Sequence, residues 1–99
     1  MALTVRIKPR ALRQIHRAAQ WWSENRPAAA GAIDFDLEEA LDLLVEQPAI
    51  GGRVHNARDA PIRRFCLVRS KYFIYYRARG GFLEVIAFWH ASRETEPRV

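Results

Sequence analysis

The chain has 99 residues, a formal net charge of +5 and a hydrophobic content of 49%. This hydrophobic content argues against a disordered protein, and the length fits one domain over residues 1–99. The single cysteine, Cys66, cannot form an internal disulfide, which argues against a secreted disulfide scaffold and predicts a cytoplasmic protein. No apolar run approaches the ~20 residues that a membrane helix needs, and the first residues lack a signal-peptide pattern. We therefore expect no contact with membranes.

The basic residues are almost all arginine. Of the 16 basic residues only Lys8 and Lys71 are lysine. The planar guanidinium of arginine suits bidentate contacts to phosphate or carboxylate. The net positive charge therefore indicates nucleic acid or an acidic protein as a partner, and an ordinary solvated basic surface is the third explanation.

The chain begins with a predicted strand and a predicted helix. Residues Leu3–Lys8 alternate between apolar and polar, which predicts a strand with one buried face. Pro9 ends this strand and suits the first turn of a helix, which we expect to run to Asn25. At ~100° per residue, four apolar residues form the buried stripe of this helix: Leu12, Ile15, Ala19 and Trp22.

The opposite side of this helix is basic and carries another tryptophan. Arg17 and Trp21 lie four residues apart, so they can meet in a cation–π contact. We expect Trp21 to be partly exposed and both residues to contact a partner. The alternative is that Trp21 only packs across the helical hairpin on Phe35.

A second helix is predicted over Ala28–Gln47. Pro48 ends it, and Ile50–Pro61 reads as an irregular basic connection that holds Arg53, His55 and Arg58. Five apolar residues form its buried stripe: Ile33, Leu37, Ala40, Leu41 and Leu44.

Three strands follow, over Phe65–Val68, Tyr72–Ala78 and Phe82–Trp89. Gly80-Gly81 predicts a tight hairpin between the last two, because both central positions of a primed turn need positive φ. Strict alternation places Leu83, Val85, Ala87 and Trp89 on one face of the last strand, and both faces are substantially apolar. A partner protein covers the second face, or the sheet keeps exposed aromatic rims.

The order strand, two helices, three strands predicts an α+β domain of two layers, with a helical hairpin packed on a sheet. Several features of this chain, taken together, resemble the RelE/ParE superfamily of bacterial type II toxins, also called plasmid-stabilisation proteins. These are Gln47-Pro48-Ala49-Ile50-Gly51 before the sheet, Tyr72, the Tyr75-Tyr76-Arg77 strand, Val85, His90-Ala91-Ser92-Arg93 and Pro97.

The resemblance spans nearly the whole chain and implies a fold and a partner. The implied fold is β-α-α-β-β-β with a mainly antiparallel sheet, in the spatial order 1-4-3-2 when the four strands are counted along the chain. The implied function is that of a bacterial toxin that forms a hetero-oligomer with a cognate acidic antitoxin.

Metal and cofactor chemistry have no support in the sequence. His16, His55 and His90 are scattered and Cys66 stands alone, whereas metal sites need clustered ligands. The glycine pairs lack the spacing of a phosphate-binding loop. We expect neither a metal nor a cofactor.

One branch of the superfamily cleaves mRNA on the ribosome. If this chain is such an endoribonuclease, His90 serves as base or acid, and Arg69, Arg77 and Arg93 stabilise the phosphorane. Tyr72 or Tyr76 would then stack on a base. The chain departs from that branch, because Val45-Glu46-Gln47 holds no lysine, no tyrosine follows Arg93, and Ala91 follows His90.

The other branch, ParE, inhibits DNA gyrase and keeps a His-x-x-Arg ending, so we favour a gyrase inhibitor. The endoribonuclease is the first alternative, and a non-toxic basic interaction domain is the second. For His90 and Arg93 a purely structural role, bracing the end of the sheet, is an alternative to catalysis. The expected partner-binding residues are Arg17, Trp21, Arg64, Tyr72, Tyr76, Arg77, His90 and Arg93.

Overall fold

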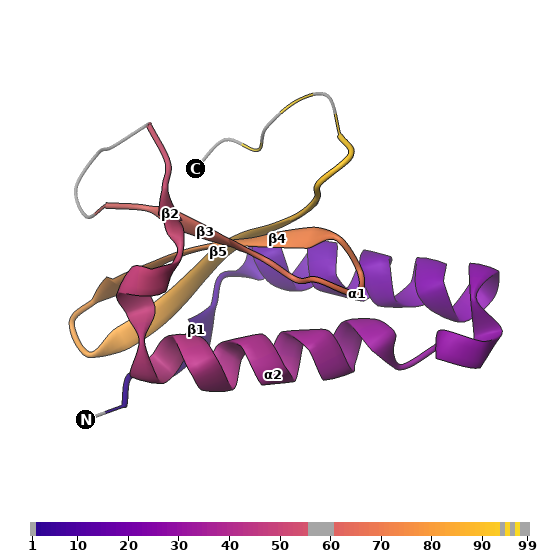
Figure 1. The fold of residues 1–99 in the computed structure, drawn as a ribbon, viewed down its shortest axis with the longest axis horizontal. Helices are drawn as coiled ribbons and strands as arrows, with labels where there is room; N and C mark the ends of the chain where they lie inside the picture. Colours follow the sequence, from indigo (N-terminus) through magenta and orange to yellow (C-terminus); the bar gives the residue numbers. More distant parts are fainter. Residues whose placement is uncertain (1, 56–60, 94, 96, 98–99) are drawn as a thin grey trace.

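The computed structural model describes residues 2–55, 61–93, 95 and 97. Its elements follow one another in the expected order (Figure 1). They are β1 (Thr4–Ile7), α1 (Pro9–Asn25), the 3₁₀ turn η1 (Pro27–Ala29), α2 (Ala32–Glu46), the 3₁₀ turn η2 (Pro48–Ile50), β2 (Gly52–Arg53), β3 (Arg63–Cys66), β4 (Tyr72–Arg79) and β5 (Phe82–His90). The α+β prediction is confirmed.

The strands form a single sheet in the order β1-β5-β4-β3-β2. β1 pairs with β5 in parallel, and the remaining neighbours are antiparallel. The expected order of four strands is therefore confirmed as β1-β5-β4-β3. The two-residue strand β2 lies in the segment that we expected to be irregular, and Arg58 of that segment lies outside the described residues.

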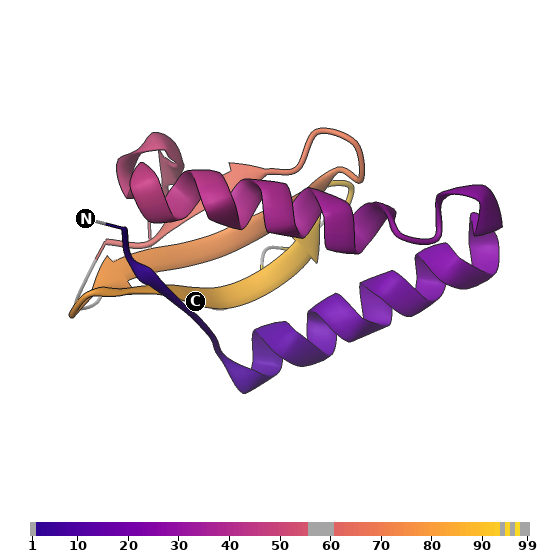
Figure 2. The ribbon, with the colours of Figure 1, turned by 90° about the horizontal axis from the view of Figure 1, so that it is seen from below.

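Both helices lie on the same side of the sheet, and no helix of the described residues lies over its other face (Figure 1, Figure 2). We call this second side the helix-free face. The core between helices and sheet is built from aliphatic side chains of both helices and from apolar residues of β4 and β5. A two-layer domain of this kind buries one face of its sheet and leaves the other for solvent or partners.

The buried stripe of α1 is shifted from the one we expected. Ile15 is buried as expected, but the other buried residues are Ala11 and Ala18, and Leu12 is 41% exposed. Two alanines facing the sheet let the helix backbone approach β5 closely, which turns Leu12 outward. Trp22 is partly buried and packs against the core, as expected.

The second helix begins later than predicted, because Pro27–Ala29 forms a separate 3₁₀ turn and α2 starts at Ala32. Its buried stripe matches the prediction except that Leu41 is only partly buried. Asp36 is also buried, which we did not expect. Its carboxylate accepts hydrogen bonds from the Ser70 backbone N–H at 3.0 Å and from Arg69 at 2.9 Å, so α2 holds the loop between β3 and β4.

The alternation that we predicted for β5 is wrong beyond Val85. Tyr75 pairs with Ala87 but Tyr76 pairs with Val85, so Ile86 is an extra residue in β5. Such a bulge reverses the faces of all residues beyond it. Leu83, Val85 and Phe88 therefore face the helices and belong to the core.

The segment between α2 and the sheet is fixed by a buried tyrosine. The Tyr76 hydroxyl donates to the Pro48 carbonyl at 2.7 Å and accepts from the Gly51 N–H at 3.0 Å. A Cβ on Gly51 would collide with that hydroxyl and lie 2.8 Å from the Arg64 carbonyl. The Pro-x-x-Gly spacing of Pro48–Gly51 therefore brings the Pro48 carbonyl and the Gly51 N–H to the same phenol oxygen, and the absence of a side chain at Gly51 makes room for that oxygen.

Candidate partner-binding groove

A groove crosses the end of the sheet, where the C-terminal half of α1 passes over Tyr72 and His90. It consists of two adjoining hollows of about 420 Å³ and 480 Å³, and both are lined by Trp21, Tyr72 and His90. We call this the Trp21 groove. Its charged lining residues are all basic: Arg17 and Arg93 in the first hollow, and Arg26, Arg69 and Lys71 in the second.

Tyr72 lies at the centre of the Trp21 groove. Its ring stacks on Phe88 with centroids 4.6 Å apart and an interplanar angle of 7°, and His90 meets it edge-on at 4.8 Å. Burial raises the pKa of Tyr72, and the charge of Arg93 opposes this only in part. The phenol is therefore a neutral hydrogen-bonding group at physiological pH, held rigidly by two rings.

His90 is braced by the turn that follows β5. The Ser92 backbone N–H donates to His90 Nδ1 at 3.1 Å, and the Ser92 hydroxyl lies 2.6 Å from the same atom. Because Nδ1 accepts these bonds, the neutral imidazole carries its proton on Nε2. This arrangement fits the structural alternative for His90, since the ring is fixed to its own turn.

The two tryptophans of α1 behave as the helical spacing predicted. Trp21 is 48% exposed and its ring meets that of Trp22 edge-on, with centroids 6.1 Å apart. The expected alternative partner, Phe35, instead lies under the Arg69 guanidinium at 4.8 Å. Trp21 is thus a large aromatic surface at the rim of the groove, and its neighbour Arg17 is exposed beside it.

Of the three arginines that we expected in a nuclease site, Arg69 and Arg93 line the Trp21 groove with His90, and Arg77 does not. Arg69 pairs with Asp36 at 2.9 Å and with Glu39 at 3.6 Å, and the Asp36 hydrogen bond is the main cause of its raised pKa. Arg93 lies over the Trp89 ring at 4.0 Å. Arg77 lies five residues along β4 from Tyr72, or ~17 Å at ~3.3 Å per residue.

The two remaining expected partner residues lie elsewhere. Arg64 lies over the Phe73 ring at 4.4 Å, on the helix-free face. Tyr76 is fully buried, and its hydroxyl is held by Pro48 and Gly51. Tyr76 therefore supports the core and has no exposed surface for stacking on a base or contacting a partner, which corrects our expectation.

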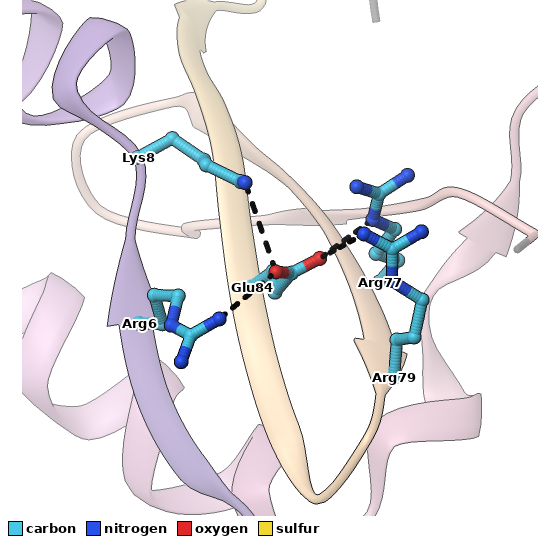
Figure 3. Close-up of polar contacts among 5 residues, drawn as sticks. All are labelled: Arg6, Lys8, Arg77, Arg79 and Glu84. Carbon is cyan, nitrogen blue, oxygen red and sulfur yellow. Dashed lines mark hydrogen bonds and ion pairs between the residues drawn. The ribbon is translucent and has the colours of Figure 1, made fainter.

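A second charged feature, on the helix-free face, was not predicted from the sequence. Figure 3 shows four cations from β1, the residue after it and β4 around one carboxylate of β5. Arg77 Nε donates to Glu84 Oε1 at 2.7 Å, and three longer ion pairs of 3.7–3.8 Å complete the Glu84 cluster. Its members are Arg6, Lys8, Arg77, Arg79 and Glu84.

The Glu84 carboxylate is buried under these cations, with only 4% of its side chain exposed. The hydrogen bond from Arg77 is the main cause that holds the pKa of Glu84 below its usual value, and the charges of Lys8, Arg77 and Arg79 add to it. The sequence does show basic residues two positions apart, at Arg6 and Lys8 and again at Arg77 and Arg79. Predicting that these two pairs meet at Glu84 requires the register of β1, β5 and β4, which the sequence does not give.

Among residues 2–55, 61–93, 95 and 97, no group of three or more His, Cys, Asp or Glu side chains could hold a metal ion. In the same part of the chain, no helix is long and apolar enough to cross a membrane.

The sequence of the chain matches a known protein family and a known relative. The family described as ParE toxin of type II toxin-antitoxin system, parDE, matches residues 5–95. Toxin RelE1 of Caulobacter vibrioides is 36% identical over 97 residues, which cover 95% of this chain and 99% of that protein.

Solved structures share the fold at low sequence identity. The chromosomal ParDE system of P. aeruginosa matches with a TM-score of 0.73 at 14% identity, over 92% of this chain and 98% of that one. The isolated E. coli RelE toxin matches with a TM-score of 0.67 at 18% identity, over 94% and 88%. The toxin-antitoxin complex RelBE2 of Mycobacterium tuberculosis matches with a TM-score of 0.57 at 21% identity, over 91% and 99%. With its sequence matched from residue 5 to residue 95 and its fold shared with these toxins, the chain belongs to the ParE toxin family of type II toxin-antitoxin systems, within the RelE/ParE superfamily.

Proposed function

We propose that this toxin inhibits DNA gyrase through protein–protein contact and is neutralised by a cognate acidic antitoxin, with which it forms a hetero-oligomer in the cytoplasm. The observation that carries the gyrase proposal is the pairing of two candidate catalytic arginines with separate carboxylates. Arg77 is bound to Glu84 at 2.7 Å, Arg69 is bound to Asp36 at 2.9 Å, and these two carboxylates lie on different elements. The match to the ParE family points the same way.

A nuclease needs several cations at one phosphate. Each missing group that stabilises a developing charge costs ~3–4 kcal/mol, or 10²–10³ in rate. Here Arg77 and Arg69 are already paired with Glu84 and Asp36, and Val45-Glu46-Gln47 offers no lysine in their place. These contacts favour a toxin that acts by binding over one that acts by cleavage.

The Trp21 groove suits an antitoxin segment with both apolar and acidic residues. Interface cores are enriched in aromatic residues and arginine, and Trp21, Tyr72 and Arg17 provide both in one groove. An amphipathic helix with its apolar face on the rings would place carboxylates beside Arg17 and Arg93. Trp21 and Tyr72 would then be the main anchors for this partner.

Co-expression with the product of the adjacent gene tests this partnership. We expect a complex that survives purification with the wild-type toxin and is weakened by Trp21→Ala. The matched control is Leu12→Ala, which removes another exposed apolar side chain of α1 that does not line the groove. Equal binding by all three proteins would refute the placement of the antitoxin in the groove.

Cleavage of mRNA on the ribosome is the second candidate function. It is favoured by the name of the relative, Toxin RelE1, and by the nearness of His90 and Arg69, which line one hollow of the groove. Primer extension on message from cells that express the toxin separates the two. Growth arrest with an induced DNA-damage response and intact messages supports gyrase inhibition, and discrete cuts inside codons that His90→Ala abolishes support cleavage. Expression without any growth arrest would instead indicate a non-toxic interaction domain.

A further inference from the structure

The Glu84 cluster lies apart from the Trp21 groove, on the helix-free face. Four cations surround one carboxylate, which gives the cluster a net charge of +3. Residues two apart on a strand are separated by ~6.6 Å, and β1 and β4 lie ~10 Å apart on either side of β5. The four charges therefore occupy a small patch, about 7 by 10 Å.

Three of the four cations of this patch stand at ion-pair distance from Glu84 and are exposed to solvent. The fourth, Arg77, donates a hydrogen bond to the carboxylate, and its side chain is 16% exposed. Arg6, Lys8 and Arg79 stand 3.7–3.8 Å from the carboxylate oxygens, and their side chains are 51%, 40% and 47% exposed. The Arg6 guanidinium carries five N–H donors and the Lys8 ammonium three, so one carboxylate that also binds Arg77 cannot satisfy them.

We propose that the Glu84 cluster binds the phosphate backbone of duplex DNA, without sequence preference. Duplex DNA carries one negative charge per ~1.7 Å of its axis, so several phosphates fall within a patch of this size. In this arrangement Glu84 positions Arg77 and spaces the other cations, and the exposed donors of Arg6 and Lys8 contact phosphate oxygens. The proposal goes beyond gyrase inhibition and does not depend on it.

The composition of the patch favours a DNA backbone over the alternatives. The cores of protein interfaces are enriched in aromatic residues and depleted of lysine and glutamate, whereas this cluster contains Lys8 and Glu84. Phosphates are neutralised by Arg and Lys side chains, such as those that surround Glu84 here. The Arg6 guanidinium lies over the ring of Phe82 beside the patch at 3.8 Å, so it occupies a ring face on which a base of a single strand would stack. The aromatic surface for a protein lies instead in the Trp21 groove.

The test is fluorescence anisotropy of a labelled random-sequence duplex of about twenty base pairs, titrated with the purified toxin between 50 and 200 mM KCl. The double variant Arg6→Gln/Lys8→Gln removes two cations of the cluster. Each lost phosphate contact reduces the slope of log affinity against log salt by ~0.9, so we expect a slope smaller by ~1.8. Over this salt range the wild-type toxin should lose ~12-fold more affinity than the variant.

The matched control, Arg13→Gln/Arg53→Gln, removes the same charge from exposed arginines of α1 and β2, and should leave the slope unchanged. Glu84→Gln should release Arg77 to the DNA and steepen the slope by ~0.9, whereas the exposed Glu38→Gln should not. If the cluster variant and its control lose the same affinity, the proposal is wrong. It is also wrong if single-stranded DNA or polyglutamate binds the wild-type toxin more tightly than the duplex at equal salt, since the patch would then suit another class of polyanion.

Discussion

Removing one oxygen atom, the hydroxyl of Tyr76, should destabilise the whole domain. The change Tyr76→Phe conserves the ring and leaves no cavity, so the cost comes from the two groups that lose their partner. The Gly51 N–H is buried and would be left unpaired, at ~1–3 kcal/mol. The Pro48 carbonyl is only partly buried and can recruit water, which adds about 1 kcal/mol or less.

The expected loss is therefore ~1–4 kcal/mol in the free energy of unfolding, measured by urea denaturation with tryptophan fluorescence. The control is Tyr75→Phe on the same strand, whose hydroxyl makes no hydrogen bond to any residue of the described part of the chain. It should change the stability by no more than ~0.5 kcal/mol. Equal losses for the two variants would refute the view that Tyr76 fixes the segment before the sheet.

The neighbouring glycines provide an independent test of the same contact. Gly51→Ala should destabilise the domain, because its Cβ would collide with the Tyr76 hydroxyl and approach the Arg64 carbonyl to 2.8 Å. Gly52→Ala meets nothing within 4 Å, so we expect little change or a gain of up to ~1 kcal/mol. Comparable behaviour of the two alanine variants would mean that the close approach at Gly51 is not required.

The remaining predictions concern the Glu84 cluster and the two tryptophans. Because the pKa of Glu84 is held below its usual value of 4.5, the stability that its ionised form contributes is fully present above pH 4.5 and is lost as the pH falls through the folded-state pKa. Urea denaturation should accordingly show Glu84→Gln less stable than the wild type at pH 7, with the difference shrinking at pH 3, and a constant difference would contradict this linkage. Trp22→Ala should cost ~3 kcal/mol, the lower end for aromatic truncation because Trp22 is only partly buried, whereas Trp21→Ala should cost under ~1 kcal/mol. Equal large losses on chemical denaturation would mean that Trp21 also supports the core.

The elements of the fold could be predicted because their ends are marked by residues with strong local effects. Pro9 opens α1, Pro48 follows α2, and Gly80 and Gly81 take the positive φ values of 61° and 81° that the hairpin requires. The bulge at Ile86 could not be predicted in this way, because it exists only relative to the pairing of β4 with β5.

The candidate site was predicted in part. Trp21, Tyr72, His90, Arg17 and Arg93 do meet in one groove, since helical phase and strand order bring them to the same end of the sheet. Nothing local to the sequence marks the partners of the other residues. Tyr76 was expected at a surface because its binding partners lie 25 and 28 residues earlier in the chain, in the Pro48–Gly51 segment.

The Glu84 cluster was missed for a similar reason. Arg6 and Lys8 were recognised as the polar side of a strand, but Glu84 and Arg77 come from strands that are separate in the sequence. Parallel pairing of β1 with β5 aligns Arg6 with Glu84, and the antiparallel hairpin aligns Arg77 with the same residue. The cluster could therefore be predicted only with the pairing registers of both β1 and β4 against β5.

The most direct test of the proposed function is a supercoiling assay with purified gyrase and relaxed plasmid. We predict that the purified toxin blocks supercoiling, and that prior mixing with the antitoxin restores it. Supercoiling that proceeds unaffected, together with messages cut inside codons on ribosomes exposed to the same toxin preparation, would contradict gyrase inhibition and assign the protein to cleavage of mRNA.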